Sequence, residues 1–538
     1  MKQMILAYRM TKIMACLVVC FLTACIQNDL PYPTVKLYIT GMTVDGQVGN
    51  ALISNDERKV VLELGETVNP KRVKVKTLEL TEGGSASIAP DSIIDLSKPY
   101  SVTLSLYQDY VWTIEATQTI ARTFTVTGQV GQAYFYPETH EASVNIPREK
   151  GLKNIEVTDL KLGPEGATQN GVEGIPSLQW ENKGGFAMTK VQVKYSDFID
   201  EEWTLFVNLS DVNVGVNSVD SWTNVAWVNG FGRDGEENGC EYKKEGDADW
   251  IRVDDSEVTH SGGNFTARII HLQENTTYVC RAYSGEEYGA ETTFTTGDKV
   301  TIPNMSFDEW HQDGKVICPW KEGDTSWWDT GNWGSTTLSA KDNITQPTSD
   351  VWSGAAAGSQ AAILGSKFVG LGSIGKFAAG NLFLGEYKAT DGTNGILGFG
   401  REFSARPTKL KGHFKYTVST INYTDEAHKA LMGKADTCIV WVALGDWDEP
   451  VEIRTNPKNS KYFDKNDPNI IAYGEMNCAE TVSAYKDFEI KLDYRSTSRV
   501  PKYLLIVCSA SKYGDYFTGG EGSTMWVDDF SLEYDYDE

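Results

Sequence analysis

The sequence has few positive charges and few histidines, and this shortage excludes one class of partner. Lys and Arg number 49 against 74 Asp and Glu, so the formal net charge is -25, and the chain has 6 His. A charge of this sign repels nucleic acid and anionic membrane surfaces, because both are negatively charged. We therefore expect no nucleic-acid partner, and contact with a membrane only through an anchor.

The chain also lacks the short motifs of several enzyme and metal-binding classes. It contains no G-x-S-x-G nucleophile elbow, no H-E-x-x-H, no P-loop, and no C-x-x-C or Cys/His cluster with zinc spacing. Beyond the amino end, no apolar stretch is long enough to cross a membrane as a helix. Glycoside hydrolases stay open, because they seldom carry short motifs.

The amino end has the pattern of an export signal. Lys2, Arg9 and Lys12 precede an apolar run at 13–22, which is too short to span a bilayer. The run closes on the sequence LTAC at 22–25, which resembles the lipobox of bacterial lipoproteins. That resemblance implies cleavage before Cys25 and a lipid on its thiol; the alternative is an ordinary signal peptide with a chance cysteine.

The predicted lipid anchor indicates a cellular location. Residues 1–24 are predicted to be the signal peptide, and the polar, proline-bearing residues 25–32 a tether. We expect a protein anchored in the outer membrane by lipid alone and exposed at the cell surface. The periplasmic face is the alternative.

The body of the chain predicts an all-β fold of several domains. It has 538 residues, 41% hydrophobic and 11% aromatic, with period-two patterning and almost no helical stretch. Residues 51–86 align with 133–168 at an offset of 82, and 110–114 resemble 201–205 at an offset of 91. These repeats predict two tandem β-sandwiches, 33–120 and 121–213, which resemble bacterial immunoglobulin-like modules and would hold the rest away from the membrane.

A third module is predicted at 214–297. Its end, 272–283 and 292–296, resembles the last strands of a fibronectin type III domain. Cys240 and Cys280 both lie in strand-like stretches of this module. Disulfides are allowed outside the cytoplasm, so the two cysteines form either a disulfide or a pair of buried free thiols.

From residue 302 the composition shifts to tryptophan, glycine and asparagine, and strands follow at 409–420, 437–444, 488–494, 503–510 and 524–534. A helical pattern is limited to 425–432. The simplest fold for 298–538 is a jelly-roll β-sandwich.

Five short sequence segments in this region resemble one family. They are FDEW at 307–310, AAGNLFLG at 378–385, FGREF at 399–403, RPTKLKGHFKY at 406–416 and WVDDFSL at 526–532. Together they resemble the putative carbohydrate metabolism domain at the C-termini of lipoproteins from Gram-negative gut commensals. The resemblance implies a jelly roll like that of carbohydrate-binding modules and a connection to sugars; some members are labelled glycoside hydrolases.

Aromatic and polar residues suggest where a sugar would bind. A sugar ring has an apolar face that an indole can cover and a polar rim that Asp, Asn and Gln can bind. The segment 326–333 offers both, and 445–449 offers a second patch at a strand end. The candidate carbohydrate-binding residues are Trp327, Trp328, Asp329, Asn332, Trp333 and Trp447. The alternative is that these tryptophans fill the core or cover its mouth.

Four acidic residues are candidates for a structural calcium site, the one cofactor considered. In similar jelly rolls a Val-Asp-Asp before the last strand, with acidic groups near the first, holds calcium. The matching residues are Asp308, Glu309, Asp528 and Asp529. The alternative is an acidic strand edge exposed to water.

Three hypotheses for function remain, and they differ in the site they require. The first is a lipoprotein that binds glycan through its jelly roll, in glycan capture or utilisation, with other outer-membrane glycan-uptake proteins as candidate partners. The second is a structural or adhesive surface protein whose tryptophans are buried. The third is a glycoside hydrolase, which needs two facing carboxylates; Glu386 and Glu402 are the candidates.

Overall fold

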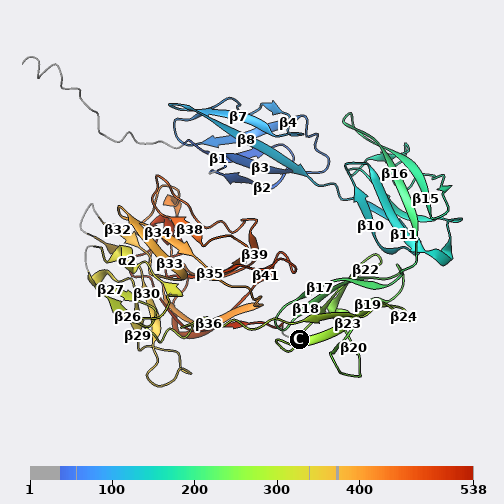
Figure 1. Cartoon of the computed structure of the whole chain (residues 1–538). Coiled ribbons are helices and arrows are strands. Elements are labelled where there is room, and N and C mark those ends of the chain that lie inside the picture. Colours follow the sequence, from blue (N-terminus) through green and yellow to red (C-terminus); the bar gives the residue numbers. More distant parts are fainter. Residues whose placement is uncertain (1–36, 56, 338–339, 371–374, 537–538) are drawn as a thin grey trace, which may run out of the picture. The chain divides into compact units, whose positions relative to one another are not determined.

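The computed structural model describes residues 37–536 apart from residue 56 and the segments 338–339 and 371–374 (Figure 1). The predicted signal peptide, tether and lipidated Cys25 lie outside this range. The chain divides into two compact units, Met1–Gln118 and Thr119–Glu538. In the described part, no helix is long and apolar enough to cross a membrane.

The first unit is a two-sheet sandwich. Its sheets are β1 (Ile39–Val44), β4 (Val73–Leu80) and β6 (Ile93–Ile94), and β2 (Gln47–Ser54), β3 (Lys59–Leu64), β8 (Asp109–Gln118), β7 (Tyr100–Ser105) and β5 (Ser85–Ala86). Trp112 is 1% exposed and lies in the core between them with Val60 and Ile114.

The second unit begins with a related sandwich. Its larger sheet contains β10 (Val130–Tyr136), β11 (Glu141–Pro147), β16 (Ile199–Ser210), β15 (Phe186–Tyr195), β13 (Thr168–Gln169) and β14 (Glu181–Asn182), and the smaller one contains β9 (Thr123–Val126) and β12 (Val157–Lys161). A turn of 3-10 helix covers Arg148–Lys150. Trp203 is fully buried in its core.

The two sandwiches share an uncommon parallel strand pair. In the first, β3 runs parallel to β8 and Lys59 pairs with Thr113. In the second, β11 runs parallel to β16 and Glu141 pairs with Thr204. These positions differ by the offsets of 82 and 91 seen in the sequence, so the internal repeat is a repeat of strand register.

A third sandwich follows. One sheet contains β17 (Gly215–Ser221), β18 (Ala226–Phe231), β22 (Asn264–Ile269) and β21 (Val258–Ser261), and the other β20 (Ile251–Arg252), β19 (Asn238–Lys244), β23 (Thr277–Ser284), β24 (Glu287–Tyr288) and β25 (Thr292–Thr295). A 3-10 turn, Asp255–Glu257, precedes β21. Cys240 and Cys280 are buried free thiols on adjacent strands, which is the second of the two alternatives that the sequence left open.

The C-terminal domain is a jelly-roll sandwich of two antiparallel sheets, as predicted. The nine-stranded sheet contains β38 (Val451–Arg454), β34 (Asn394–Phe399), β33 (Asn381–Asp391), β42 (Tyr503–Ser509), β37 (Cys438–Gly445), β39 (Ile470–Cys478), β41 (Asp493–Tyr494), β28 (Trp328–Asp329) and β35 (Arg401–Glu402). The five-stranded sheet contains β29 (Thr345–Thr348), β30 (Ala361–Gly365), β43 (Thr524–Glu533), β36 (Lys409–Thr417) and β40 (Val482–Lys491).

Smaller elements surround this sandwich. They are β26 (His311–Asp313), β27 (Val316–Cys318), α2 (Asn332–Ser335), β31 (Lys367–Val369), β32 (Lys376–Ala378) and the 3-10 turns Ala340–Asp342, Lys429–Leu431 and Gly514–Tyr516. The helical pattern at 425–432 therefore contains one short 3-10 turn.

The central strand β37 is buried on both of its faces. Cys438, Val440 and Val442 point into the core between the two sheets. Ile439 and Trp441 point the other way, into a second apolar cluster on the outer face of the nine-stranded sheet. A continuous apolar run such as CIVWVAL is typical of a strand covered on both sides. Several residues of this outer cluster also line a cavity.

The burial of the cysteines predicts the order in which they react. Of the six described cysteines, Cys478 is half-buried and the others are buried. The thiol contact with Cys280, together with burial, raises the pKa of Cys240 well above its ordinary value, and the thiolate is the reactive form. We expect a short iodoacetamide pulse on the native protein to label Cys478 first, as read by peptide mass spectrometry. Early labelling of Cys240 or Cys280, or a disulfide between them, would contradict this structure.

Candidate functional site

A cavity of about 370 Å³ lies on the outer face of the nine-stranded sheet of the C-terminal domain. Its floor consists of apolar side chains from four neighbouring strands, and on β33, β37 and β42 they alternate with core residues. They are Phe383, Leu397, Phe399, Ile439, Trp441 and Val507. Because successive side chains of a strand point to opposite faces, the strands that build the core also build this floor.

Three other segments form the walls. Gly334 and Ser335 of α2 lie on one side, and β32 with the following Ala379 contributes a second wall. The segment that includes Gly514, Asp515 and Phe517 contributes a third. The walls therefore come from stretches that are far apart in the sequence.

Polar side chains at the cavity are held in place by hydrogen bonds. The Tyr387 hydroxyl lies 2.9 Å from the Thr390 hydroxyl. Lys376 Nζ donates to Asn394 Oδ1 at 2.6 Å, and Asn394 Nδ2 donates to the Asp391 carbonyl at 2.9 Å. Asn381 Oδ1 accepts from the Gly331 amide at 2.7 Å. Fixed amides and hydroxyls above an apolar floor are the usual composition of a small-molecule site.

Aromatic rings continue beside the cavity. The Trp441 ring stacks on Phe463 at 4.3 Å, with 20° between the ring planes. Tyr462 and Tyr516 lie 4.1 Å apart. The half-buried side chain of Phe517 lies at the wall, and Lys376 Nζ is 4.1 Å from the centroid of its ring.

Asp515 is the one carboxylate among the described residues that line the cavity. Burial raises its pKa from the ordinary 3.8 to about 6. No hydrogen bond or ion pair to this carboxylate occurs in the described part of the domain. The side chain is thus a half-buried acceptor available to a ligand.

The structure corrects the prediction for the tryptophan segment 326–333. Trp328 is 1% exposed in the sandwich core, and its Nε1 donates to the Pro303 carbonyl at 3.0 Å. Its ring has no free face for a sugar, because β28 pairs with β33 and directs it inward. The side chains of Trp327 and Trp333 are half-buried and do not line the cavity.

Asn332 and Asp329 are also structural, and their prediction as sugar ligands is corrected too. Asn332 is fully buried; its Oδ1 accepts from the Ile344 and Thr345 amides, and its Nδ2 donates to the Ile317 and Thr345 carbonyls.

Asp329 is 4% exposed, and burial raises its pKa to about 6. It accepts from the Tyr387 amide at 2.8 Å and from Trp333 Nε1 at 3.2 Å. It therefore supports the cavity through Tyr387 without reaching a ligand itself.

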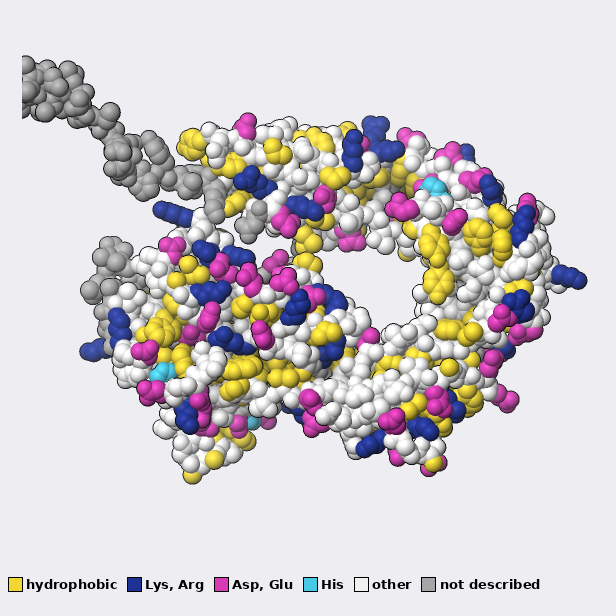
Figure 2. Space-filling model, viewed as in Figure 1, with side chains coloured by type: hydrophobic (Ala, Val, Ile, Leu, Met, Phe, Trp, Pro, Cys, Tyr) yellow, Lys and Arg dark blue, Asp and Glu magenta, His cyan; other side chains and the backbone are white. Residues whose placement is uncertain are grey.

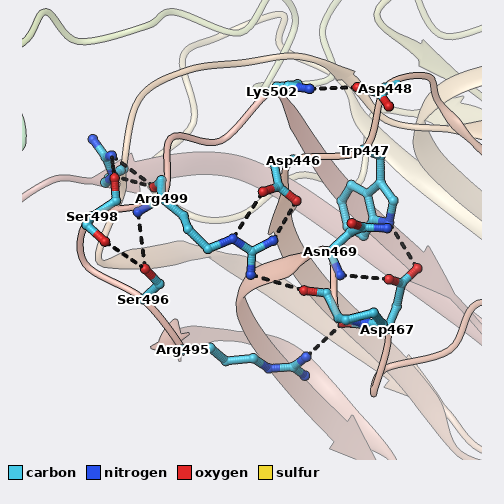
Figure 3. A network of polar contacts seen from close by, with 12 residues as sticks. Asp446, Trp447, Asp448, Asp467, Asn469, Arg495, Ser496, Ser498, Arg499 and Lys502 are labelled. Carbon is cyan, nitrogen blue, oxygen red and sulfur yellow. Dashed lines mark hydrogen bonds and ion pairs between the residues drawn. The ribbon is translucent and has the colours of Figure 1, made fainter. Parts of the chain in front are cut away.

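Trp447 lies in a polar network at the end of β37 (Figure 3). Its indole is 8% exposed, and Nε1 donates to Asp467 Oδ2 at 3.0 Å. The neighbouring Asp446 accepts from Arg499 Nε at 3.0 Å. Trp447 covers the outer cluster instead of offering a free ring face, so this prediction is corrected as well.

The candidate catalytic residues lie outside the cavity. The side chains of Glu386 and Glu402 are both exposed, and neither is part of the cavity lining. The alternation along β33 directs Glu386 to solvent while Phe383 faces the floor. The structure therefore does not bring these two carboxylates to the described cavity.

The predicted calcium ligands hold a loop of the chain. Asp528 Oδ2 accepts from the Trp352 amide at 3.0 Å, and Asp529 Oδ2 accepts from the Trp352 indole at 2.9 Å. Asp308 Oδ1 accepts from the Gln360 amide at 2.7 Å, and Glu309 is exposed. Within the described ranges no group of three or more His, Cys, Asp or Glu could hold a metal ion, so the carboxylate set for calcium is not assembled.

The fold defines the class: a chain of tandem β-sandwiches that ends in a jelly roll with a cavity on one sheet face. Residues 305–533 match the family described as "Putative carbohydrate metabolism domain". The protein thus carries a C-terminal domain of this family, as the resemblance of the five segments predicted. The match covers less than half of the chain.

Solved structures give more distant likenesses. A putative glycoside hydrolase from Bacteroides thetaiotaomicron VPI-5482 is 14% identical, covers 94% of this chain and 99% of its own, and has a TM-score of 0.31. One from Bacteroides vulgatus ATCC 8482 is 21% identical over 43% of this chain and 96% of its own, with a TM-score of 0.33.

A surface glycan-binding protein from Prevotella bryantii is 9% identical over 64% of this chain and 81% of its own, with a TM-score of 0.15. No curated protein sequence matches the chain. TM-scores this low do not establish a shared fold.

The raised pKa of Asp515 predicts a pH effect on stability. Because its pKa is higher in the folded protein than in the unfolded chain, the folded state binds the proton more tightly. Stability is therefore lost as the pH rises from about 4 to about 6. In Asp515→Asn this loss is absent, so we expect a free energy of unfolding about 1–3 kcal/mol higher than wild type at pH 8, and little difference at pH 4.

Thermal unfolding of both proteins between pH 4 and pH 8 measures this effect. Asp249→Asn, at an exposed position of the third sandwich, is the matched control and should not change the pH profile. A melting temperature of Asp515→Asn equal to or below wild type at pH 8 would contradict the burial of this carboxyl.

The burial of Trp328 predicts how its substitution affects stability and glycan affinity. Trp328→Ala removes a large core side chain, so we expect a loss of about 3–5 kcal/mol in unfolding free energy. Trp328→Phe keeps an aromatic ring and should lose less, and its affinity for any glycan that the protein binds should stay at the wild-type value. Denaturant unfolding and glycan titration of the same samples separate the two roles, since a binding platform would lose affinity with Phe as well.

Proposed function

We propose that the protein binds carbohydrate in the cavity of its C-terminal domain. The observation that carries the proposal is the cavity itself: an aromatic and aliphatic floor under fixed amides and hydroxyls, within a domain of the carbohydrate metabolism family. A volume of about 370 Å³ lies in the range of about 300–1,000 Å³ that is usual for small-molecule sites.

The chemistry of the lining matches the two sides of a sugar ring. The half-buried Phe517 ring offers apolar surface for the C–H face, and the 8% exposed Trp441 adds the part of its ring that lines the cavity floor. Asn381, Asn394 and Ser509 offer donors and acceptors for the hydroxyl rim. These polar groups belong to strands or strand ends, which hold them more rigidly than a free loop would.

The carboxylate count favours binding over cleavage. A glycoside hydrolase uses two carboxyl groups on opposite sides of the scissile bond. Asp515 supplies one, with the raised pKa that a general acid needs, but no second carboxylate lines the cavity among the described residues. The hydrolase is therefore the second candidate, and Asp515 is the residue on which it rests.

The amino end and the three sandwiches before the C-terminal domain support a proposal for its cellular location. We infer an outer-membrane lipoprotein held by Cys25, with three sandwiches between the anchor and the sugar-binding domain. Support comes from the lipobox-like sequence at 22–25 and from the three two-sheet modules that precede the jelly roll. Cell-surface exposure and glycan-uptake partners follow from this location as proposals.

Glycan titration of the chain from residue 26 onward tests the proposal. We expect a bound oligosaccharide to change the fluorescence of Trp441 without release of reducing sugar. In Phe517→Ala the affinity should fall about tenfold, because one stacking surface worth about 1.4 kcal/mol is lost. In Trp441→Phe binding should persist while the fluorescence change falls.

Tyr107→Ala is the control for an aromatic residue outside the cavity, since Tyr107 is 88% exposed in the first unit. Release of reducing sugar that stops in Asp515→Asn would establish the hydrolase instead. An affinity unchanged by Phe517→Ala would place the sugar elsewhere and contradict the proposal.

A further inference from the structure

The charge of the cavity is opposite to that of the chain. The protein has a formal net charge of -25, and Asp and Glu mix with Lys and Arg over the visible surface (Figure 2). The described cavity lining holds two cations, Lys376 and Lys512, and one acid, Asp515. A cationic excess in a concave apolar site of an acidic protein points to a ligand that brings negative charge.

Lys376 has no acidic partner in the described domain. Its Nζ donates to the neutral Asn394 amide and lies over the Phe517 ring, and no ion pair involves it. An ammonium group has three donors, so at least one remains for a ligand. Burial lowers the pKa of Lys376, which means that the protein does not compensate the charge it buries. An anionic ligand group would provide that compensation.

Lys512 makes only a long ion pair, with Glu475. Its Nζ lies 3.9 Å from Glu475 Oε1, beyond hydrogen-bond distance. Both oxygens of Glu475 are already bonded, Oε2 to the Tyr473 hydroxyl at 2.6 Å and Oε1 to Asn477 Nδ2 at 3.0 Å. Lys512 can therefore turn toward a ligand at little cost in broken contacts.

Resting on the proposed function, we propose that the cavity binds a sugar with an anionic ring substituent, a carboxylate or a sulfate, and that Lys376 binds this group with Lys512 as the second cation. The apolar floor contacts the C–H face of the ring, and the Asp515 carboxylate accepts hydrogen bonds from its hydroxyls.

Calorimetric titration with matched oligosaccharides tests this inference on the chain from residue 26 onward. The probes are uronic-acid oligomers, the methyl esters of the same oligomers, and sulfated and unsulfated galactans of equal length. We expect at least tenfold weaker binding of the neutral member than of the anionic member in one of the two pairs. Which pair shows the difference distinguishes carboxylate from sulfate. The preference should shrink as salt rises, because it depends on charge.

Substitutions then connect the preference to the residue. Lys376→Gln keeps a donor for Asn394 and removes the charge, so the anionic and neutral members should bind almost equally. Lys376→Arg should restore most of the preference, and Lys458→Gln, at an exposed position outside the cavity, should leave it unchanged. Circular dichroism of each variant verifies the fold.

The outcomes separate this inference from the proposed function. Neutral sugars bound as tightly as their anionic partners would overturn the inference and keep the sugar-binding proposal. A preference that survives in Lys376→Gln would overturn the role of Lys376. No binding of any sugar, charged or neutral, would overturn both.

Discussion

The structure of the C-terminal domain depends on a sheet that is buried on both faces. Strands β37 and β42 send alternate side chains into the core between the sheets and into the outer cluster. Most antiparallel sheets expose one face to water, where polar residues alternate with apolar ones. Here the outer face keeps an apolar surface that must be covered, and the segments that cover it incompletely leave the cavity. The cavity is thus a consequence of how the second face is covered.

Buried polar side chains hold this cover in place. Asn332 satisfies four backbone groups, and Asp329 bonds the Tyr387 amide and the Trp333 indole. Buried polar groups are costly unless they are paired, so this full pairing makes the segment rigid. Asn and Asp side chains could bind sugar hydroxyls if they lay in an exposed loop. Here Asn332 and Asp329 instead hold the backbone that surrounds the cavity.

This explains how far the sequence could predict the site. The strand periodicity and the repeat at 51–86 and 133–168 are local or pairwise patterns, and both appear in the structure as strands and as matching register. The segment 326–333 has the composition of a sugar site, yet its burial is decided by pairing with β33, more than fifty residues later. The cavity residues Lys376, Trp441 and Asp515 come from separate stretches, and no short motif joins them.

The effect of charge also depends on where the charged residues lie in the structure. The net charge describes the whole surface and predicts repulsion of anions at long range. Screening limits that repulsion to roughly 8–10 Å in physiological salt, so an anionic sugar feels mainly the groups in the cavity once it arrives. There two lysines and an apolar floor act in a less polar environment, where each charge counts for more. An acidic protein with a cationic cavity would therefore bind an acidic sugar slowly but selectively, because the surface disfavours loose binding of anions while the cavity favours a ring of the right shape.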